Sequence, residues 1–251
     1  MRFKWKPETM PYFLSPENLH IGQTLDLTGE EAGHLLLSRR LRPGEVVRFQ
    51  GPDGKRFLCE AVEVKKKSLT AVVKEPVVVP QEPKTTTTLF LAYINQAALD
   101  MVLQKTTELL AGRVVLFNSQ NVAHVLTRQK FEERQSRWGK ILWEAAKQSE
   151  RVAPPELAYV KDLPAALALA GKLDQVILLD PTAEKKLGQV VGRGLATLGL
   201  FVGPEGGFTQ AENRQVLGLP RSAAASLGPV LLRAETAALA AVAISQDVVA
   251  G

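Results

Sequence analysis

The chain has 251 residues and a net charge of +5, and its pI is near 9.3. Hydrophobic residues make up 45% of it and charged residues 23%, which is the composition of an ordinary globular protein and excludes a disordered chain. The longest uninterrupted apolar stretch, residues 237–244, is far shorter than the roughly 20 residues that a membrane-spanning helix needs. The small basic excess is compatible with nucleic-acid binding, although many metabolic enzymes carry a similar charge.

The single cysteine, Cys59, excludes an intrachain disulfide, and its β-favouring surroundings predict a small buried side chain. Three scattered histidines show no metal-ligand spacing, so we expect no metal site. The basic residues at the N-terminus precede no apolar segment, so a signal peptide is not predicted. We therefore expect a cytoplasmic protein.

The first part of the chain is predicted to be rich in β-strands. Residues 56–64 alternate between polar and apolar, which predicts one solvent-exposed face. A short helix is predicted over residues 29–40, with Thr28 and Glu31 as a capping box. We therefore predict a small β-barrel over residues 1–75. Its β-favouring runs, separated by turn signals, are residues 26–28, 45–49, 56–64 and 69–73.

A proline-punctuated stretch over residues 76–88 predicts an extended linker. From residue 89 onward, strand-like and helix-like segments alternate, which predicts an α/β domain with a mostly parallel sheet over residues 89–251. The capping pair Thr209 and Glu212 predicts a helix start. The predicted strands are residues 89–92, 114–117, 175–179 and 200–202, and the predicted helices are residues 100–110, 130–150, 163–170 and 235–248.

Two motifs near the C-terminus predict a ligand site. Residues 201–208 read F-V-G-P-E-G-G-F, so an apolar run enters a turn whose glycines permit close backbone approach and positive φ. Residues 227–237 read L-G-P-V-L-L-R-A-E-T-A, which as plain sequence is an apolar core strand with a Gly-Pro break before a helix. Loops at strand ends of this kind are where an open α/β sheet binds its ligand.

These motifs and three further segments resemble the RsmE family of ribosomal RNA methyltransferases, which belongs to the SPOUT superfamily. The resemblance runs through nearly the whole chain, and the segments follow the family's order. They are E-E-A-G-H-L at 30–35 with R-R-L-R-P-G at 39–44, Q-K-T-T-E-L at 104–109, and R-W-G-K-I-L-W-E-A-A-K-Q-S-E-R at 137–151 with Pro154 and Pro155 behind it.

The resemblance implies a PUA-like RNA-binding barrel at the N-terminus and a SPOUT methyltransferase domain behind the linker. It also implies that residues 175–251, approximately, form a deep trefoil knot. Knots are rare, and periodicity alone would predict only a doubly wound fold. The family further implies a homodimer formed through the C-terminal domain.

For function, the resemblance implies methylation of N3 of one uracil in 16S ribosomal RNA, within the small ribosomal subunit, with S-adenosylmethionine as cofactor and without a metal. Two alternatives remain open: a related SPOUT methyltransferase acting on another RNA base, and a non-catalytic RNA-binding assembly factor. Intact cofactor motifs argue against the second. A Rossmann-type methyltransferase is disfavoured because no Gly-x-Gly-x-x-Gly follows an early strand.

The resemblance implies a cofactor pocket with three walls. The plain structural alternative is a tight turn for the first wall and a core strand for the second. The third wall, at the end of a predicted strand, is the least specific. The implied residues are Val202, Gly203, Pro204, Glu205, Gly206 and Gly207 in the first wall, Leu227, Gly228, Val230, Leu231, Leu232 and Thr236 in the second, and Leu179 and Asp180 in the third.

Three residues are catalytic candidates. Arg233 would stabilise the negative charge that spreads over the uracil oxygens when N3 loses its proton, because a guanidinium stays protonated and presents a planar fork of donors. The alternative role for Arg233 is structural, as a salt bridge to Glu205 or Glu235. Glu205 itself would orient Arg233 or accept the proton, or simply cap the turn. Arg151 would bind RNA or the acceptor.

Basic residues in both halves are RNA-binding candidates. Arg39, Arg40 and Arg42 would contact phosphates, unless they form a solvated basic turn. Arg137 and Arg151 are predicted to share one face of the long helix, for which a solvated face is the alternative. The last helix is apolar nearly all round and must be buried, either in a dimer interface or in the core of its own chain.

Two loops depart from the family pattern. A loop that usually carries a basic residue reads Asn95-Gln96-Ala97-Ala98, and the usual E-R-S is replaced by Asn118-Ser119-Gln120-Asn121. We expect these loops to contact RNA or the acceptor rather than the cofactor, so the departures bear on substrate choice.

Overall fold

The structure is a computed structural model that describes residues 12–29 and 41–250. It divides into two compact units: unit 1 comprises Met1–Gln81 and Glu150–Ala153, and unit 2 comprises Glu82–Ser149 and Pro154–Gly251. The linear division into 1–75, 76–88 and 89–251 assigns residues 150–153 to the second domain, whereas they belong to unit 1. All but the first residue of the predicted helix over 29–40 lies outside the described residues, and so do its capping partner Glu31 and Arg39 and Arg40.

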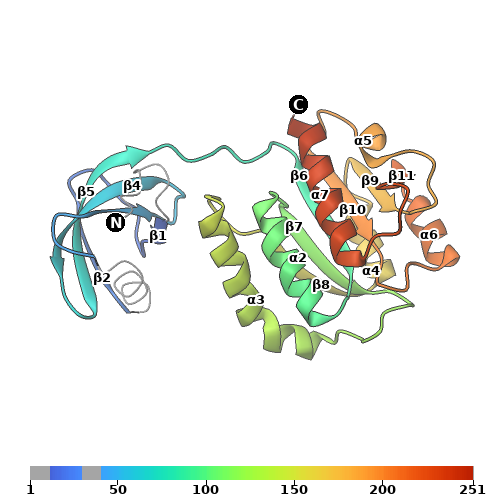
Figure 1. The fold of residues 1–251 in the computed structure, drawn as a ribbon, viewed down its shortest axis with the longest axis horizontal. Coiled ribbons are helices and arrows are strands. Elements are labelled where there is room, and N and C mark those ends of the chain that lie inside the picture. Colours follow the sequence, from blue (N-terminus) through green and yellow to red (C-terminus); the bar gives the residue numbers. More distant parts are fainter. Residues whose placement is uncertain (1–11, 30–40, 251) are drawn as a thin grey trace. The chain divides into compact units, whose positions relative to one another are not determined.

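Unit 1 contains a curled sheet of five strands in the order β1-β3-β4-β5-β2 within the described residues (Figure 1). All neighbours pair antiparallel except β1 and β3. The inner side packs Phe13, Phe49 and Phe57 with aliphatic side chains into one core. The strands are β1 (Tyr12–Leu14), β2 (Thr24–Thr28), β3 (Val46–Gln50), β4 (Arg56–Val64) and β5 (Ser68–Val77).

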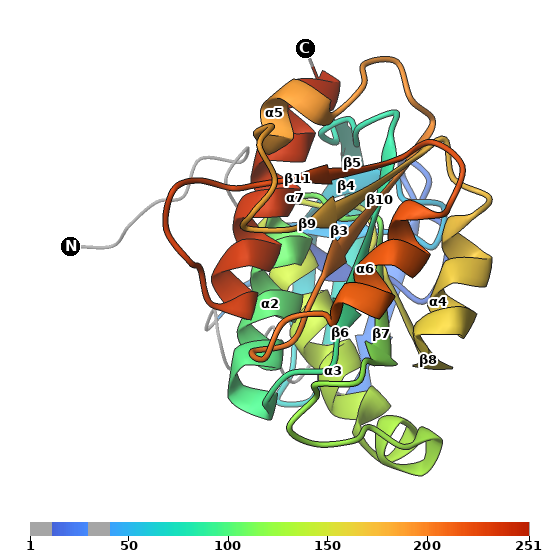
Figure 2. The same ribbon diagram turned by 90° about the vertical axis from the view of Figure 1, so that its right-hand side faces the viewer.

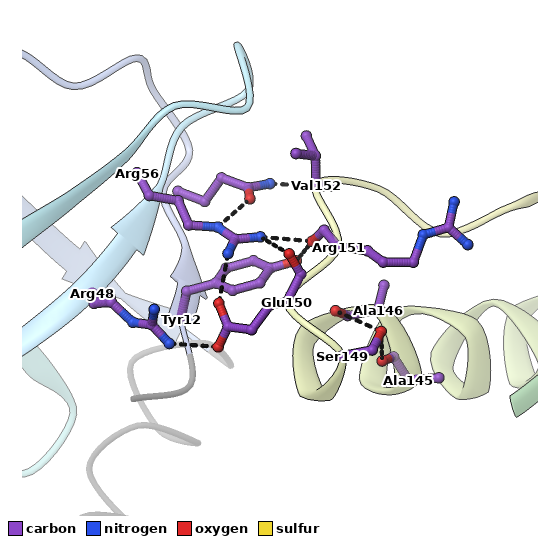
Figure 3. A network of polar contacts seen from close by, with 10 residues as sticks. Tyr12, Arg48, Arg56, Ala145, Ala146, Ser149, Glu150, Arg151 and Val152 are labelled. Atoms are coloured by element: carbon purple, nitrogen blue, oxygen red, sulfur yellow. Dashed lines mark hydrogen bonds and ion pairs between the residues drawn. The ribbon is translucent and has the colours of Figure 1, made fainter. Parts of the chain in front are cut away.

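The prediction that β4 alternates between a buried and a wet face is wrong for its first half. Residues 56–59 are all buried, and Arg56 is only 1% exposed. The guanidinium of Arg56 lies 3.8 Å from the centre of the Tyr12 ring and donates to both a carboxylate oxygen and the carbonyl of Glu150 (Figure 3). The outer face is therefore covered by β1 and by residues 150–152.

Unit 2 is built on a parallel sheet of six strands in the order β11-β9-β10-β6-β7-β8, which confirms the predicted parallel α/β domain. The alternation of strands and helices generates it, because each helix carries the chain back to start the next strand in the same direction. The strands are β6 (Thr86–Ala92), β7 (Arg113–Asn118), β8 (Glu156–Asp162), β9 (Gln175–Leu179), β10 (Thr197–Val202) and β11 (Ser222–Ala225).

Helices cover both faces of this sheet (Figure 2). One face packs against α2, α3, α5 and α7, and the other face packs against α4 and α6. The stacked rings of Phe90 and Phe201 lie on the second face, with centroids 4.5 Å apart. The helices are α2 (Gln96–Glu108), α3 (Arg128–Gln148), α4 (Leu163–Ala170), α5 (Leu187–Val190), α6 (Gln210–Leu217) and α7 (Ala234–Ala250).

Helix ends follow ordinary capping chemistry. The predicted capping box is confirmed at the start of α6: the Thr209 hydroxyl accepts from the Glu212 N–H, and the Glu212 carboxylate accepts from the Thr209 N–H. Helix α3 ends at Gln148, and Glu150 beyond it has a φ of +63°. The prediction that Arg151 shares a helix face with Arg137 is therefore wrong, because the chain leaves the helix before reaching it.

The second C-terminal motif is not a strand. Residues 227–233 form an irregular loop between β11 and α7, in which Val230 and Leu231 are 64% and 84% exposed. The Gly228-Pro229 pair explains the difference, because proline supplies no N–H for a strand ladder.

Helix α7 is buried on one face by residues such as Ala238, Ala241 and Val242, while Leu239 and Ala240 on other sides are half-buried. That buried face packs within its own chain, against α2, α5 and the β6 and β10 strands. Its role in a dimer stays a prediction, as does the threading of the predicted knot. Across the described ranges, no helix combines the length and apolarity that crossing a membrane requires.

Candidate active site

A cavity of about 700 Å³ opens in unit 2 where β9 and β10 end and α7 begins. This is the carboxyl edge of the parallel strands, where open α/β sheets bind ligands. Most of the residues predicted to bind the cofactor line it, whereas Gly206, Leu227, Gly228, Val230 and Thr236 do not. The predicted residues that do line it are Leu179, Asp180, Val202, Gly203, Pro204, Glu205, Gly207, Leu231 and Leu232.

Residues 203–207, the GPEGG turn, form one wall of the cavity and need their glycines for steric reasons. The Gly207 N–H donates to the Pro204 carbonyl at 2.9 Å, which closes the turn, and Gly207 has a φ of +67°. A Cβ on Gly203 would lie 3.2 Å from the Phe208 nitrogen, inside normal contact distance. The turn therefore brings bare backbone to the edge of the cavity.

Arg233 lies in the cavity wall and is exposed. Among the residues that the structure describes, its guanidinium forms no hydrogen bond or ion pair, so the alternative salt bridge to Glu205 or Glu235 is not made. Its carbonyl accepts from the Ala237 N–H at 2.8 Å, which starts α7 and fixes the backbone. A guanidinium held by its main chain, with its donors uncommitted, is available to a ligand.

Glu205 also lines the cavity, but it pairs with Asn95 rather than with Arg233. One carboxylate oxygen accepts from the Asn95 side-chain amide at 3.1 Å and lies 3.4 Å from the Asn95 backbone nitrogen. Asn95 was not predicted as a site residue, because the predicted helix began at residue 100, whereas α2 begins at Gln96 with Asn95 as its N-cap.

Asp180 is fixed by its own loop. One of its carboxylate oxygens accepts from the backbone N–H of Thr182 at 2.8 Å and from the Thr182 hydroxyl at 2.7 Å. The other oxygen lies 3.4 Å from the Asn213 amide nitrogen. Thr182 and Asn213 line the cavity too, and neither was predicted, because an isolated threonine and an isolated helical asparagine carry no local signal.

The two loops that depart from the family pattern both contact the GPEGG turn, and their expected contact with RNA or the acceptor stays a prediction. Besides the contact between Asn95 and Glu205, the Asn121 amide donates to the carbonyl of Gly207 at 3.0 Å. Both loops follow strands adjacent in the sheet, and parallel strands bring their carboxyl ends together.

The other predicted basic residues lie outside this cavity. Arg151 is 5% exposed and belongs to unit 1, where its carbonyl accepts from Tyr12 and Arg56. Arg137 makes two hydrogen bonds to Asp100, at 2.6 and 2.8 Å. Arg42 is exposed in the turn before β3. Within the described ranges, no group of three or more histidine, cysteine or acidic side chains could hold a metal.

Comparisons with known proteins agree with this arrangement. A family model described as an RNA methyltransferase domain matches residues 80–246. The ribosomal RNA small subunit methyltransferase E of Bacillus subtilis is 27% identical over 95% of this chain and 96% of its own length. The protein of the same name from Rickettsia conorii is 31% identical over 81% of each chain.

Solved structures give the same result. The crystal structure of a ribosomal RNA small subunit methyltransferase E from Neisseria gonorrhoeae, bound to S-adenosylmethionine, is 30% identical to this chain. It matches with a TM-score of 0.82 over 96% of this chain and 98% of its own. A putative methyltransferase from Legionella pneumophila, also with bound S-adenosylmethionine, matches with a TM-score of 0.82 at 27% identity, over 95% of this chain and 97% of its own.

Proposed function

Since this chain belongs to the RsmE family of ribosomal RNA methyltransferases, we propose that it methylates N3 of a uracil in 16S ribosomal RNA of the small ribosomal subunit. Its methyl donor is S-adenosylmethionine. The observation that carries the proposal is the cavity at the carboxyl edge of the sheet, into which the GPEGG turn and the uncommitted Arg233 both face.

The cavity has the properties that S-adenosylmethionine requires. Its volume of about 700 Å³ falls within the usual range for pockets of small ligands. Leu179, Leu231 and Leu232 offer apolar surface for an adenine ring, and the GPEGG turn brings backbone groups to the wall. The carboxylates of Asp180 and Glu235 suit the cationic part of the cofactor.

The cofactor supplies a methyl group activated by its sulfonium, so this chain has to hold the acceptor in line and exclude water. N3 lies on the pairing edge of uracil, which requires an unpaired or extruded base. As N3 loses its proton, negative charge develops on the neighbouring carbonyl oxygens, and Arg233 would stabilise it. Glu205, held by Asn95, would accept the proton.

Unit 1 would serve in binding RNA. Arg42 is exposed there and suits contact with phosphate, and the side chain of Arg137 in unit 2 is 53% exposed although it pairs with Asp100. The side chain of Arg151 is buried, so we assign it the least direct part.

A homodimer through unit 2 is the assembly that we propose. Val230 and Leu231 are largely exposed although both are aliphatic, and they precede the half-buried faces of α7. Analytical ultracentrifugation is expected to give a dimer at micromolar concentration. Replacing both Val230 and Leu231 with serine should yield a larger monomer fraction, and an unchanged sedimentation coefficient would contradict this assignment.

The experiment for the proposed reaction identifies the product. Small ribosomal subunits that lack modifications are incubated with the protein and S-adenosylmethionine, and the nucleosides of the 16S RNA are then separated by mass spectrometry. We expect N3-methyluridine at a single position, where the blocked pairing edge also stops reverse transcriptase. A methyl group on a different base atom would favour a related methyltransferase of other specificity, and cofactor binding without transfer to any RNA would favour the non-catalytic alternative.

A further inference from the structure

Two loops of unit 2 reach the GPEGG turn and contact it through asparagine side chains. The turn follows β10, and the two loops follow β6 and β7. These three strands are consecutive parallel neighbours in the sheet, so their carboxyl ends meet at one edge. The sheet order thus brings residues 95 and 121 to the turn, although each is more than eighty residues away in sequence.

Asn121 contacts the backbone of the turn at its two final glycines. Its amide nitrogen lies 3.0 Å from the carbonyl oxygen of Gly207 and 3.4 Å from that of Gly206. A Cβ on Gly206 would lie only 3.1 Å from the Cβ of Asn121, so side chain and turn are in close contact. Two carbonyl oxygens facing one group require a donor there, which an amide provides and a carboxylate does not.

The loop that carries Asn121 is itself anchored. At its base, the side chain of Asn118 accepts from the Leu126 N–H at 2.8 Å and donates to the Leu126 carbonyl at 2.9 Å. The Gln120 N–H donates to the buried carboxylate of Glu212 at 2.8 Å. Asn121 is therefore presented by a loop fixed on both sides of it.

Asn95 contacts the turn through the Glu205 side chain, and its two hydrogen bonds fix the orientation of its side-chain amide. The Asn95 side-chain oxygen caps α2 by accepting from the Ala98 N–H at 3.0 Å. Its amide nitrogen consequently faces Glu205, to which it donates at 3.1 Å. A single side chain thus connects the start of α2 to a carboxylate in the cavity wall.

From this geometry we propose that Asn95 and Asn121 are positioning residues that hold the GPEGG turn in the shape that binds S-adenosylmethionine. The proposal rests on the proposed function and adds to it the residues that set cofactor affinity from outside the glycine-rich motif. Asn121 lies outside the lining of the cavity and Asn95 lies at its edge beside Glu205, and each acts through the turn.

The first test truncates Asn121. Titration calorimetry of the full-length Asn121→Ala variant with S-adenosylmethionine is expected to give a dissociation constant about three- to tenfold higher, the effect of one or two lost hydrogen bonds. The KM for the cofactor should rise by the same factor while kcat stays within about twofold, and the thermal midpoint should not move. Asn18→Ala, which truncates an exposed asparagine of unit 1, is the matched control and should bind like the wild type.

The second test separates the two functions of Asn95. Serine and aspartate both cap helices well, so Asn95→Ser and Asn95→Asp preserve the start of α2 while removing the side-chain amide that donates to Glu205. We expect weaker cofactor binding in both, and more so in Asn95→Asp because its oxygens face the Glu205 carboxylate. Tighter binding by Asn95→Asp would overturn the proposal, since it would show that charge near a cationic cofactor matters rather than the position of the turn.

The outcomes distinguish this proposal from the proposed function. A wild-type protein that binds no S-adenosylmethionine would overturn both. A wild-type protein that binds the cofactor, with Asn121→Ala and Asn95→Ser binding equally well, would overturn the positioning roles alone. Loss of binding together with a lowered thermal midpoint in Asn121→Ala would also overturn them, because general destabilisation would then account for the loss.

Discussion

Arg233 combines an ordered main chain with a side chain that forms no ion pair in the described part of the protein. Its carbonyl starts α7, and its guanidinium is exposed in the cavity wall. Sequence reasoning identified the residue, but the expected setting between a strand and a helix was wrong, because an irregular loop precedes it. Such a loop leaves the backbone before the arginine without a strand ladder to constrain it.

Truncation of Arg233 should therefore damage catalysis more than cofactor binding. We expect Arg233→Ala to lower kcat by about 100-fold or more, the usual cost of removing a group that stabilises developing charge. The dissociation constant of S-adenosylmethionine should change by less than about threefold. Arg233→Lys should recover part of the rate, because it keeps the charge but not the planar fork.

Arg193→Ala is the matched control, since Arg193 is exposed on the same unit outside the cavity. Single-turnover methyl transfer and titration calorimetry measure the two quantities separately. Equal losses of cofactor affinity and of rate would assign Arg233 to ground-state binding instead.

Cys59 illustrates a residue whose prediction from sequence is confirmed. It is fully buried in β4, and burial raises the pKa of its thiol to about 12. The unfolded chain loses this proton from about pH 9 upward, whereas the folded chain retains it. Because the folded-state pKa of this acid is raised, its contribution to stability is lost as pH rises through that window, by up to about 1.4 kcal/mol per pH unit.

Cys59 should consequently resist alkylation by iodoacetamide at pH 8 in the native protein and react once the protein is unfolded in urea. Mass spectrometry after a timed pulse measures the modified fraction. Rapid modification of the native protein would mean that the thiol is accessible and that its burial has been overstated.

At the scale of elements, residues 150–153, which follow α3 after Ser149, form part of unit 1 rather than unit 2. Glu150 supplies one carboxylate to two guanidinium groups, those of Arg48 and Arg56, which are almost fully buried (Figure 3). Gln50 adds a hydrogen bond to the Val152 carbonyl at 2.7 Å. Burial lowers the pKa of Arg56, and the neighbouring Tyr12 and Glu150 partly offset that effect.

Removing the Glu150 carboxylate should destabilise unit 1. Glu150→Ala removes the carboxylate that pairs with the buried guanidinium groups of Arg48 and Arg56. We expect the free energy of unfolding to fall by about 2–4 kcal/mol. This is below the full cost of breaking a buried ion pair, because the Glu150 side chain is 27% exposed. Hydrogen–deuterium exchange of the β3 and β4 amides in the full chain should accelerate accordingly.

Glu144→Ala provides the comparison, since the Glu144 side chain is 64% exposed and lies 3.8 Å from Lys147, and ion pairs of exposed carboxylates contribute about 0–1 kcal/mol. Equal exchange rates in the two variants would contradict the assignment of Glu150 as the main link between this segment and the sheet.

Which elements could be predicted depended on their local signals. The α4 helix and the β9 strand were predicted with their exact bounds, because each is a uniform apolar run with clear ends. Strand β11 was missed: its sequence S-A-A-A has little β-propensity, and only its pairing with β9 makes it a strand. Strand β8 was missed although its sequence E-L-A-Y-V-K-D contains the short apolar run L-A-Y-V, whose residues are half-buried in the structure.

At the scale of the whole molecule, the alternation of strands and helices sufficed to predict a parallel α/β sheet, but not the order of its strands. That order determines which loops meet the GPEGG turn, and so periodicity could not predict the contacts of Asn95 and Asn121. The membership of residues 150–153 in unit 1 likewise depends on partners about a hundred residues away, such as Arg48 and Arg56. Family resemblance located the cavity, and the structure supplied the residues around it.

Methyl incorporation tests the central claim most directly. Purified protein is incubated with S-adenosylmethionine labelled in its methyl group and with an equimolar mixture of unmodified small subunits, unmodified large subunits and tRNA, and the label in each RNA is counted. The account predicts about one methyl group per 16S RNA and almost none in the other RNAs. Labelling of large-subunit RNA or tRNA in preference to 16S RNA, or of no RNA at all, would contradict it.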